Sequence, residues 1–73
     1  MAKIDITSEM TGSIWKIMKS IGDKVAEGDT VILIEAMKME IPVIAPEDGV
    51  IAEILVQEGN MVADGDLVMR LEK

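Results

Sequence analysis

A lysine between two methionines is the residue of this sequence best placed to do chemistry. Lys38 lies in the segment Ala36-Met37-Lys38-Met39, which is bordered by Glu35 and Glu40. An exposed lysine usually only adds solubility, but exposed methionines beside it are unfavourable, because burial stabilises apolar surface by roughly 25 cal/mol per Å². The segment also lacks the Gly, Asn, Asp, Ser and Pro residues that turns favour. We therefore predict that this segment is a tight turn between two strands that presents the Lys38 amine for covalent modification.

Composition excludes most other chemistry. The chain contains no cysteine and no histidine, which removes disulfides, thiolate or imidazole metal sites, and Ser/His or Cys/His nucleophiles. Fourteen acidic residues against seven basic ones give a net charge of −7, and Trp15 is the only aromatic residue. This balance argues against binding of nucleic acid or of an anionic membrane surface. We expect a protein that is not an enzyme.

Length and apolar content predict a single small domain over residues 1–73. The chain is 49% apolar, which is too much for a disordered segment. No apolar run approaches the roughly 18 residues that span a bilayer, and the first residues lack the apolar core of a signal peptide. We therefore expect a cytoplasmic domain that folds as a monomer.

The glycines reveal an internal repeat. Gly12, Gly22 and Gly28 are 10 and 6 residues apart, and a second set repeats these spacings at an offset of 37, namely Gly49, Gly59 and Gly65. Seven further pairs at this offset are identical or similar: Ile14 and Ile51, Ile17 and Ile54, Val25 and Val62, Asp29 and Asp66, Val31 and Val68, Ile34 and Leu71, Glu35 and Glu72. Two copies of one half-domain, related by a pseudo-two-fold axis, would place the Lys38 turn at the end opposite the termini.

Runs rich in Val and Ile between turn residues predict about eight short strands and no helix. The clearest runs are Ser13–Met18, Thr30–Ala36, Met39–Ile44 and Val50–Val56. Turns are predicted where Gly supplies positive φ beside Asp or Asn, at Gly22-Asp23, Glu27-Gly28-Asp29, Glu47-Asp48-Gly49, Gly59-Asn60 and Asp64-Gly65-Asp66. Pro42 indicates an edge strand or a strand start.

A two-sheet sandwich closes such a chain most economically. Its predicted core consists of Ile4, Ile6, Ile14, Ile17, Val25, Val31, Ile34, Ile41, Ile51, Ile54, Val62, Val68 and Leu71. The methionines away from the turn are interpreted as gap-fillers in a core without Phe or Tyr, at Met10, Met18, Met61 and Met69. Trp15, which corresponds to Ala52 in the other half, is interpreted as a packing residue, with contact to a partner as the alternative.

The residues around Lys38 have two interpretations each. Met37 and Met39 present a flexible apolar contact surface to a partner's active site, or they simply pack beside the turn. Glu35 and Glu40 orient the turn or steer a partner, or they form a solvated acidic rim.

The segment Glu35-Ala36-Met37-Lys38-Met39-Glu40 resembles the biotin attachment motif of biotinyl domains in biotin-dependent carboxylases. Similarity to the same family extends over roughly residues 4–72, through Gly22-Asp23-Lys24-Val25, Glu27-Gly28-Asp29, Ala45-Pro46 with Gly49, Gly59 with Val62, and Gly65-Asp66. The resemblance implies an all-β, flattened barrel-sandwich hybrid of two four-stranded antiparallel sheets. Lys38 would lie on the hairpin between the fourth and fifth strands. Equal glycine spacings leave no room for the protruding loop of some acetyl-CoA carboxylase domains, so the chain is similar to thumbless domains and free-standing attachment proteins.

By that resemblance, a biotin protein ligase would join biotin to Lys38 as an amide, with Glu35, Ala36, Met37 and Met39 around the attachment point. The domain would then be a carrier without catalytic groups. The carboxyl group would travel as carboxybiotin from a biotin carboxylase to a carboxyltransferase. Tethering a reactant in this way raises its effective concentration to the order of millimolar.

Two other classes are compatible with the same fold. Lipoyl carrier domains of 2-oxo acid dehydrogenase complexes also present a lysine at the hairpin, but their tip usually reads Asp-Lys-Ala rather than Met-Lys-Met, and a dual biotin/lipoyl attachment protein is a related possibility. The related sandwich of efflux-pump adaptors is an unmodified interaction module. Such adaptors have no reason to keep Lys38 between two methionines.

Overall fold

The structure is a computed structural model that describes residues 2–73, so Met1 lies outside the described part of the predicted domain. It contains eight β-strands: β1 (Lys3–Thr7), β2 (Gly12–Ile17), β3 (Lys24–Val25), β4 (Thr30–Ala36), β5 (Met39–Ile44), β6 (Gly49–Ile54), β7 (Met61–Val62) and β8 (Leu67–Glu72). The all-β prediction is confirmed. None of the described residues forms a helix that could cross a membrane.

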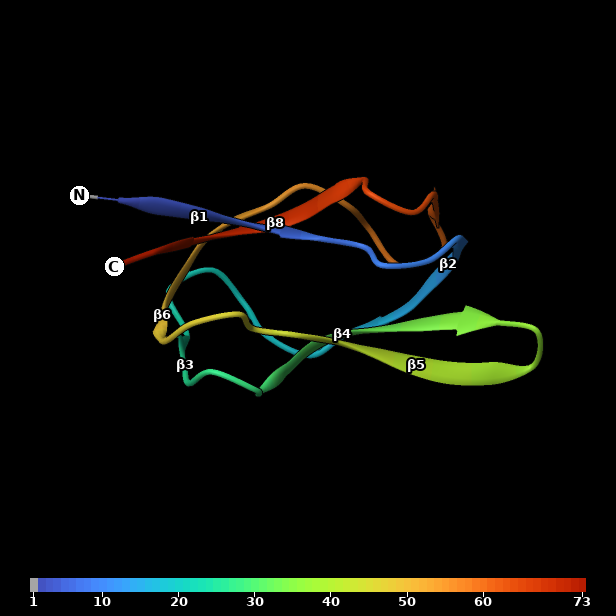
Figure 1. The fold of residues 1–73 in the computed structure, drawn as a ribbon, viewed down its shortest axis with the longest axis horizontal. Coiled ribbons are helices and arrows are strands. Elements are labelled where there is room, and N and C mark those ends of the chain that lie inside the picture. The colour runs from blue at the N-terminus through green and yellow to red at the C-terminus, as the bar shows by residue number, and fades with distance from the viewer. Residues whose placement is uncertain (1) are drawn as a thin grey trace.

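The strands form two four-stranded antiparallel sheets that pack face to face (Figure 1). Sheet A has the strand order β1-β8-β6-β3 and sheet B has the order β5-β4-β2-β7. Pro42 lies on β5, which is an edge strand, as predicted for a residue that cannot donate a backbone hydrogen bond. The barrel-sandwich arrangement is confirmed.

The 37-residue repeat is a structural repeat with interleaved strands. At this offset β1 corresponds to β5, β2 to β6, β3 to β7 and β4 to β8, so the two sheets have equivalent strand orders. Backbone hydrogen bonds repeat in the same way. The Gly22 N–H donates to the Ile51 carbonyl oxygen at 2.8 Å, and the Gly59 N–H donates to the Ile14 carbonyl oxygen at 2.7 Å. Each sheet therefore contains two strands from each half, which makes neither half independent of the other.

The glycines serve two different purposes. Four of them have φ between 91° and 93°, as predicted for the turn positions Gly22, Gly28, Gly59 and Gly65. The prediction of positive φ at Gly49 is wrong, because Gly49 begins β6 and has no positive φ. A Cβ at Gly49 would lie 3.0 Å from the Glu72 carbonyl oxygen, and one at the equivalent Gly12 would lie 2.6 Å from the Glu35 carbonyl oxygen. Gly12 thus allows β2 to lie close against β4, next to the predicted functional turn.

The core lies between the two sheets and agrees with most of the predicted set. The buried apolar residues are Ile6, Ile14, Val25, Val31, Ile32, Ile34, Val43, Ala45, Ile51, Val62, Val68, Met69 and Leu71. Ile4, Ile17 and Ile54 pack at its periphery, and Ile41 is partly exposed. Met69 is buried as predicted for a gap-filler, and the prediction missed three buried residues: Ile32, Val43 and Ala45.

Register shifts explain part of this miss. The β4–β5 pairing shifts between Thr30 and Ile32, so Val31 and Ile32 are both fully buried although they are adjacent. A bulge of this kind breaks the alternation of inward and outward side chains that a regular strand has.

Two of the four methionines interpreted as core gap-fillers lie on the surface. Met69 is buried and Met10 packs against the core, but Met18 is 49% exposed and Met61 is 71% exposed. Met61 lies opposite Ser13, on the face of β7 that points away from the core. The interpretation of Trp15 as a packing residue is also wrong, because its side chain is 41% exposed at a bulge in β2.

Candidate functional site

Strands β4 and β5 form a hairpin whose loop consists of Met37 and Lys38 alone. Ala36 lies opposite Met39 as the last strand pair. Met37 and Lys38 have φ values of 51° and 63°, and positive φ at both central residues is the pattern of a type I′ turn. Gly and Asn normally fill such positions, because a side chain in the left-handed region costs roughly 1–2 kcal/mol per residue. Met37 and Lys38 thus adopt a backbone conformation that is unfavourable for both residue types.

The turn is exposed and projects from the end of the molecule. Met37 is 92% exposed, Met39 is 63% exposed and Lys38 is exposed. The last pairing of β4 with β2 joins Ser13 to Glu35, and Gly12 at the start of β2 lies beside Ala36, so the turn residues Met37 and Lys38 lie beyond β2. Figure 1 shows the hairpin at one end of the long axis and both termini at the other. The alternative interpretation, in which Met37 and Met39 pack beside the turn, requires them to be buried. Neither of them is.

Two carboxylates lie opposite each other at the base of the turn. Glu35 and Glu40 form a cross-strand pair, and both are exposed. Like charges in directly opposite positions destabilise a strand pair. Within residues 2–73 neither carboxylate makes an ion pair. Since Ala36 is only partly buried, the five predicted site residues Glu35, Ala36, Met37, Lys38 and Met39 form one continuous accessible segment.

An apolar groove of about 370 Å³ borders the hairpin on the side that faces the core. Ile34, Ile41 and Val43 line it from the hairpin, and Thr7 at the end of β1 and Met10 in the following loop line it from the other side. Sequence analysis did not predict this groove, because its walls come from segments more than twenty residues apart.

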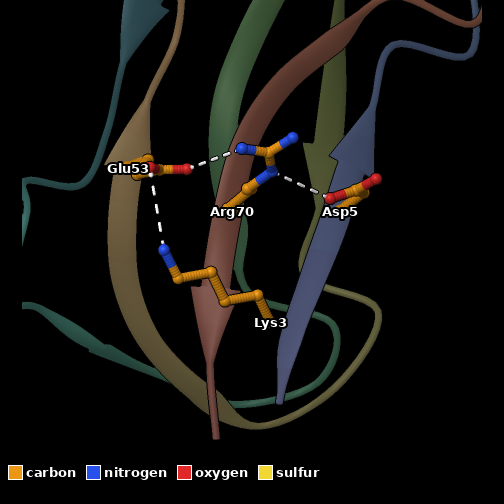
Figure 2. Close-up of polar contacts among 4 residues, drawn as sticks. All are labelled: Lys3, Asp5, Glu53 and Arg70. Atoms are coloured by element: carbon orange, nitrogen blue, oxygen red, sulfur yellow. Dashed lines mark hydrogen bonds and ion pairs between the residues drawn. The ribbon is translucent and has the colours of Figure 1, made fainter. Parts of the chain in front are cut away.

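The strongest polar network lies elsewhere, on the outer face of sheet A (Figure 2). Arg70 on β8 donates to Glu53 on β6 at 3.0 Å and to Asp5 on β1 at 3.1 Å, and Lys3 lies 3.8 Å from Glu53. The hydrogen bond from Arg70, and then the charge of Lys3, lower the pKa of the Glu53 carboxyl. These charges satisfy one another far from Lys38, so the network is a stabilising feature of the sheet rather than part of the site.

Comparison with known proteins agrees with this geometry. The family model described as "Biotin-requiring enzyme" matches residues 3–71. The chain belongs to the biotin/lipoyl attachment family. It is 36% identical to the biotin/lipoyl attachment protein of Bacillus subtilis over 66 residues, covering 90% of each chain. It is 38% identical to a biotinylated protein of Mycobacterium leprae over 64 residues, covering 88% of this chain and 90% of that one.

Larger members of the family contain the same fold as a small part. The structure of the urea carboxylase of Kluyveromyces lactis matches with a TM-score of 0.93 and 43% identity, over 99% of this chain and 6% of the carboxylase. A dihydrolipoyllysine-residue acetyltransferase of Haemophilus influenzae is 40% identical over 60 residues, covering 82% of this chain and 11% of that one. The comparisons therefore establish an attachment domain close to the biotinyl domains of carboxylases, and they include a lipoyl relative.

Proposed function

We propose that this protein is a biotin carboxyl carrier in which the side-chain amine of Lys38 is the attachment point. The observation that carries the proposal is the position of Lys38 at the second residue of an exposed two-residue turn, at the end of the molecule opposite the termini. In the described structure nothing covers the Lys38 side chain, so its amine can enter the active site of another protein.

Attachment requires an activated acyl donor that the ligase supplies. The Lys38 amine attacks the carbonyl carbon of biotinyl adenylate, an amide bond forms, and the bond to AMP breaks. The lost amine proton passes to the ligase or to solvent. When attached, biotin supplies a ureido nitrogen that accepts and releases a carboxyl group. This chain contributes position and reach, and the catalytic groups belong to a biotin carboxylase and a carboxyltransferase.

The surroundings of Lys38 suit a group that is handed between active sites. Met37 and Met39 are flexible, polarisable and exposed, so they provide an adaptable contact surface for more than one partner. The strained turn keeps the lysine at the extreme tip of the hairpin. We assign the contact role to these methionines and to Ala36, and a steering role to Glu35.

Lipoylation is the second candidate, and the lipoyl relative from Haemophilus influenzae favours keeping it in the test. The same amine and the same turn would serve a lipoyl ligase equally well on geometry alone. The biotinylated relative of similar length and the carboxylase structural match support biotin as the principal group.

Intact mass after co-expression separates these candidates. We expect the protein to gain the mass of one biotinyl group with a biotin protein ligase, and Lys38→Ala to gain none. The free energy of unfolding of Lys38→Ala should stay within about 0.5 kcal/mol of the parent, as for most exposed sites. A lipoyl adduct without a biotinyl adduct would refute the biotin proposal. A biotinyl adduct on Lys38→Ala would refute the site.

A further inference from the structure

The two halves of the repeat provide an internal comparison of the two outer sheet surfaces. Residues 37 positions apart occupy equivalent places on sheet A and sheet B. Structural requirements are the same at the two members of each pair. Where the residue types differ systematically, the fold itself does not explain the difference.

The outer face of sheet B carries an apolar band that sheet A lacks. Leu33 lies opposite Pro42 on one side and opposite Lys16 on the other, next to the bulged Trp15. Met61 lies on β7 at the neighbouring cross-strand position and is 71% exposed. At the equivalent places sheet A has Ala52 for Trp15, Arg70 for Leu33, Asp5 for Pro42 and Lys24 for Met61. At these four positions sheet A thus has no large apolar side chain.

The charges differ in the same direction. Sheet A balances its outer face with three cations and three carboxylates, namely Lys3, Lys24, Arg70, Asp5, Glu53 and Glu72. Its Lys3 lies opposite Glu72, whereas the equivalent pair in sheet B is Glu40 opposite Glu35. Sheet B therefore keeps two uncompensated carboxylates between the apolar band and the Lys38 turn. An arrangement that costs stability in one half and is avoided in the other points to a partner.

We propose that the outer face of sheet B is the docking surface for the ligase that modifies Lys38, an inference that rests on the proposed function. The complementary ligase surface is apolar at its centre, against Trp15, Leu33 and Met61, and basic where it meets Glu35 and Glu40. The ligase is favoured over later partners because the unmodified amine reaches no further than one lysine side chain. Its enzyme must therefore contact the protein surface beside the turn.

The test uses the symmetry of the chain to choose its variants. Trp15→Ala and Met61→Lys place on sheet B the residue or charge that sheet A carries at the equivalent position. Ala52→Lys adds the same charge as Met61→Lys to the outer face of sheet A and serves as the matched control. Ligation rates with a biotin protein ligase and limiting amounts of each purified, unmodified chain give kcat/KM, and thermal melting verifies that each variant is folded.

We expect Trp15→Ala and Met61→Lys each to lower kcat/KM for ligation about tenfold, which corresponds to the loss of one hot-spot contact. Ala52→Lys should stay within about twofold, and all three should reach full modification at long times. Equal effects of Ala52→Lys and Met61→Lys, or unchanged rates in both sheet B variants, overturn the docking surface. In either case the parent still acquires biotin, whereas failure of the proposed function leaves the parent unmodified. Dimerisation of the parent that Met61→Lys abolishes would assign the face to a second copy instead.

Discussion

Met37 and Lys38 occupy the two left-handed positions of a turn that usually carries Asn-Gly. Met and Lys lack the backbone freedom of Gly and the local hydrogen bonds of Asn, so each is strained there. Strain of this kind persists where the surrounding strands fix the conformation, and it clusters at functional sites. The side chains at this turn are therefore chosen for something other than stability.

Replacing Met37 by Asn should stabilise the protein while leaving Lys38 in place. Asn tolerates the left-handed region, so we expect Met37→Asn to raise the free energy of unfolding by about 1 kcal/mol, measured by urea denaturation. Met39→Asn is the matched control, because Met39 lies in β5 without positive φ and Asn is disfavoured in strands. No gain in stability for Met37→Asn, or an equal or larger gain for Met39→Asn, would contradict the strain at Met37.

Prediction from sequence located both strands of the hairpin and the turn between them, but not the conformation of the turn. The predicted strands Thr30–Ala36 and Met39–Ile44 have the observed bounds of β4 and β5. The conformation of the two residues between them was not predictable, because neither Met nor Lys signals positive φ. The residue types identified the turn as unusual, but they did not predict its backbone geometry.

At the scale of elements, bulges and close backbone approaches decide what the strands can do. The pairing of β2 with β4 shifts between Ile14 and Lys16, and that of β6 with β8 shifts between Ile51 and Glu53. These shifts are equivalent under the repeat, and they turn Trp15 outward in one half. The shift in the β4–β5 pairing likewise leaves the adjacent Val31 and Ile32 both buried, and Ile32 is a core residue that the sequence analysis did not predict.

Gly12 and Gly49 are equivalent positions with unequal tolerance. A methyl group at Gly12 would meet the Glu35 carbonyl oxygen at 2.6 Å, so we expect Gly12→Ala to lower the free energy of unfolding by about 2–3 kcal/mol. Gly49→Ala meets its neighbouring carbonyl at 3.0 Å and should lose clearly less. Chemical denaturation of both variants checks this order. A larger loss for Gly49→Ala would show that the space beside β4 is not what restricts Gly12.

At the scale of the whole molecule, the repeat was readable from sequence but its interleaving was not. The offset of 37 is satisfied equally by two halves that lie side by side and by two halves that exchange strands. The observed sheets take β1 and β3 into one sheet with β6 and β8, and this pairing joins residues far apart in the chain. No local sequence signal encodes such pairing. The family resemblance supplied the two four-stranded sheets, but not which strands pair within them.

Lowering the pH should remove the contribution that the Glu53 carboxylate makes to folding stability. Because the folded state lowers the pKa of Glu53, its contribution to stability is present above the ordinary glutamate value of 4.5 and is lost as the pH falls through the folded value. We expect Glu53→Gln to melt below the parent at pH 7. The gap should narrow steadily below about pH 4.5 and shrink in high salt, because the network is exposed.

Thermal melting from pH 7 to pH 3 measures the gap. Glu27→Gln, which removes an exposed carboxylate outside the network, is the control of equal charge change. A gap between Glu53→Gln and the parent that is constant with pH would contradict a lowered pKa for Glu53.

The elongated shape of the molecule places the hairpin turn far from both termini. The molecule measures 36 × 17 × 17 Å, with the Lys38 turn and the termini at opposite ends of the long axis. A flexible chain attached at either terminus would need about 11 fully extended residues to span 36 Å. The folded strands cover the same distance at a fixed length. Unlike a flexible chain, they lose no conformational entropy by being extended. The domain is therefore a stiff extension of any tether joined to a terminus, and it carries the Lys38 turn further from the tether's anchor by up to its own length.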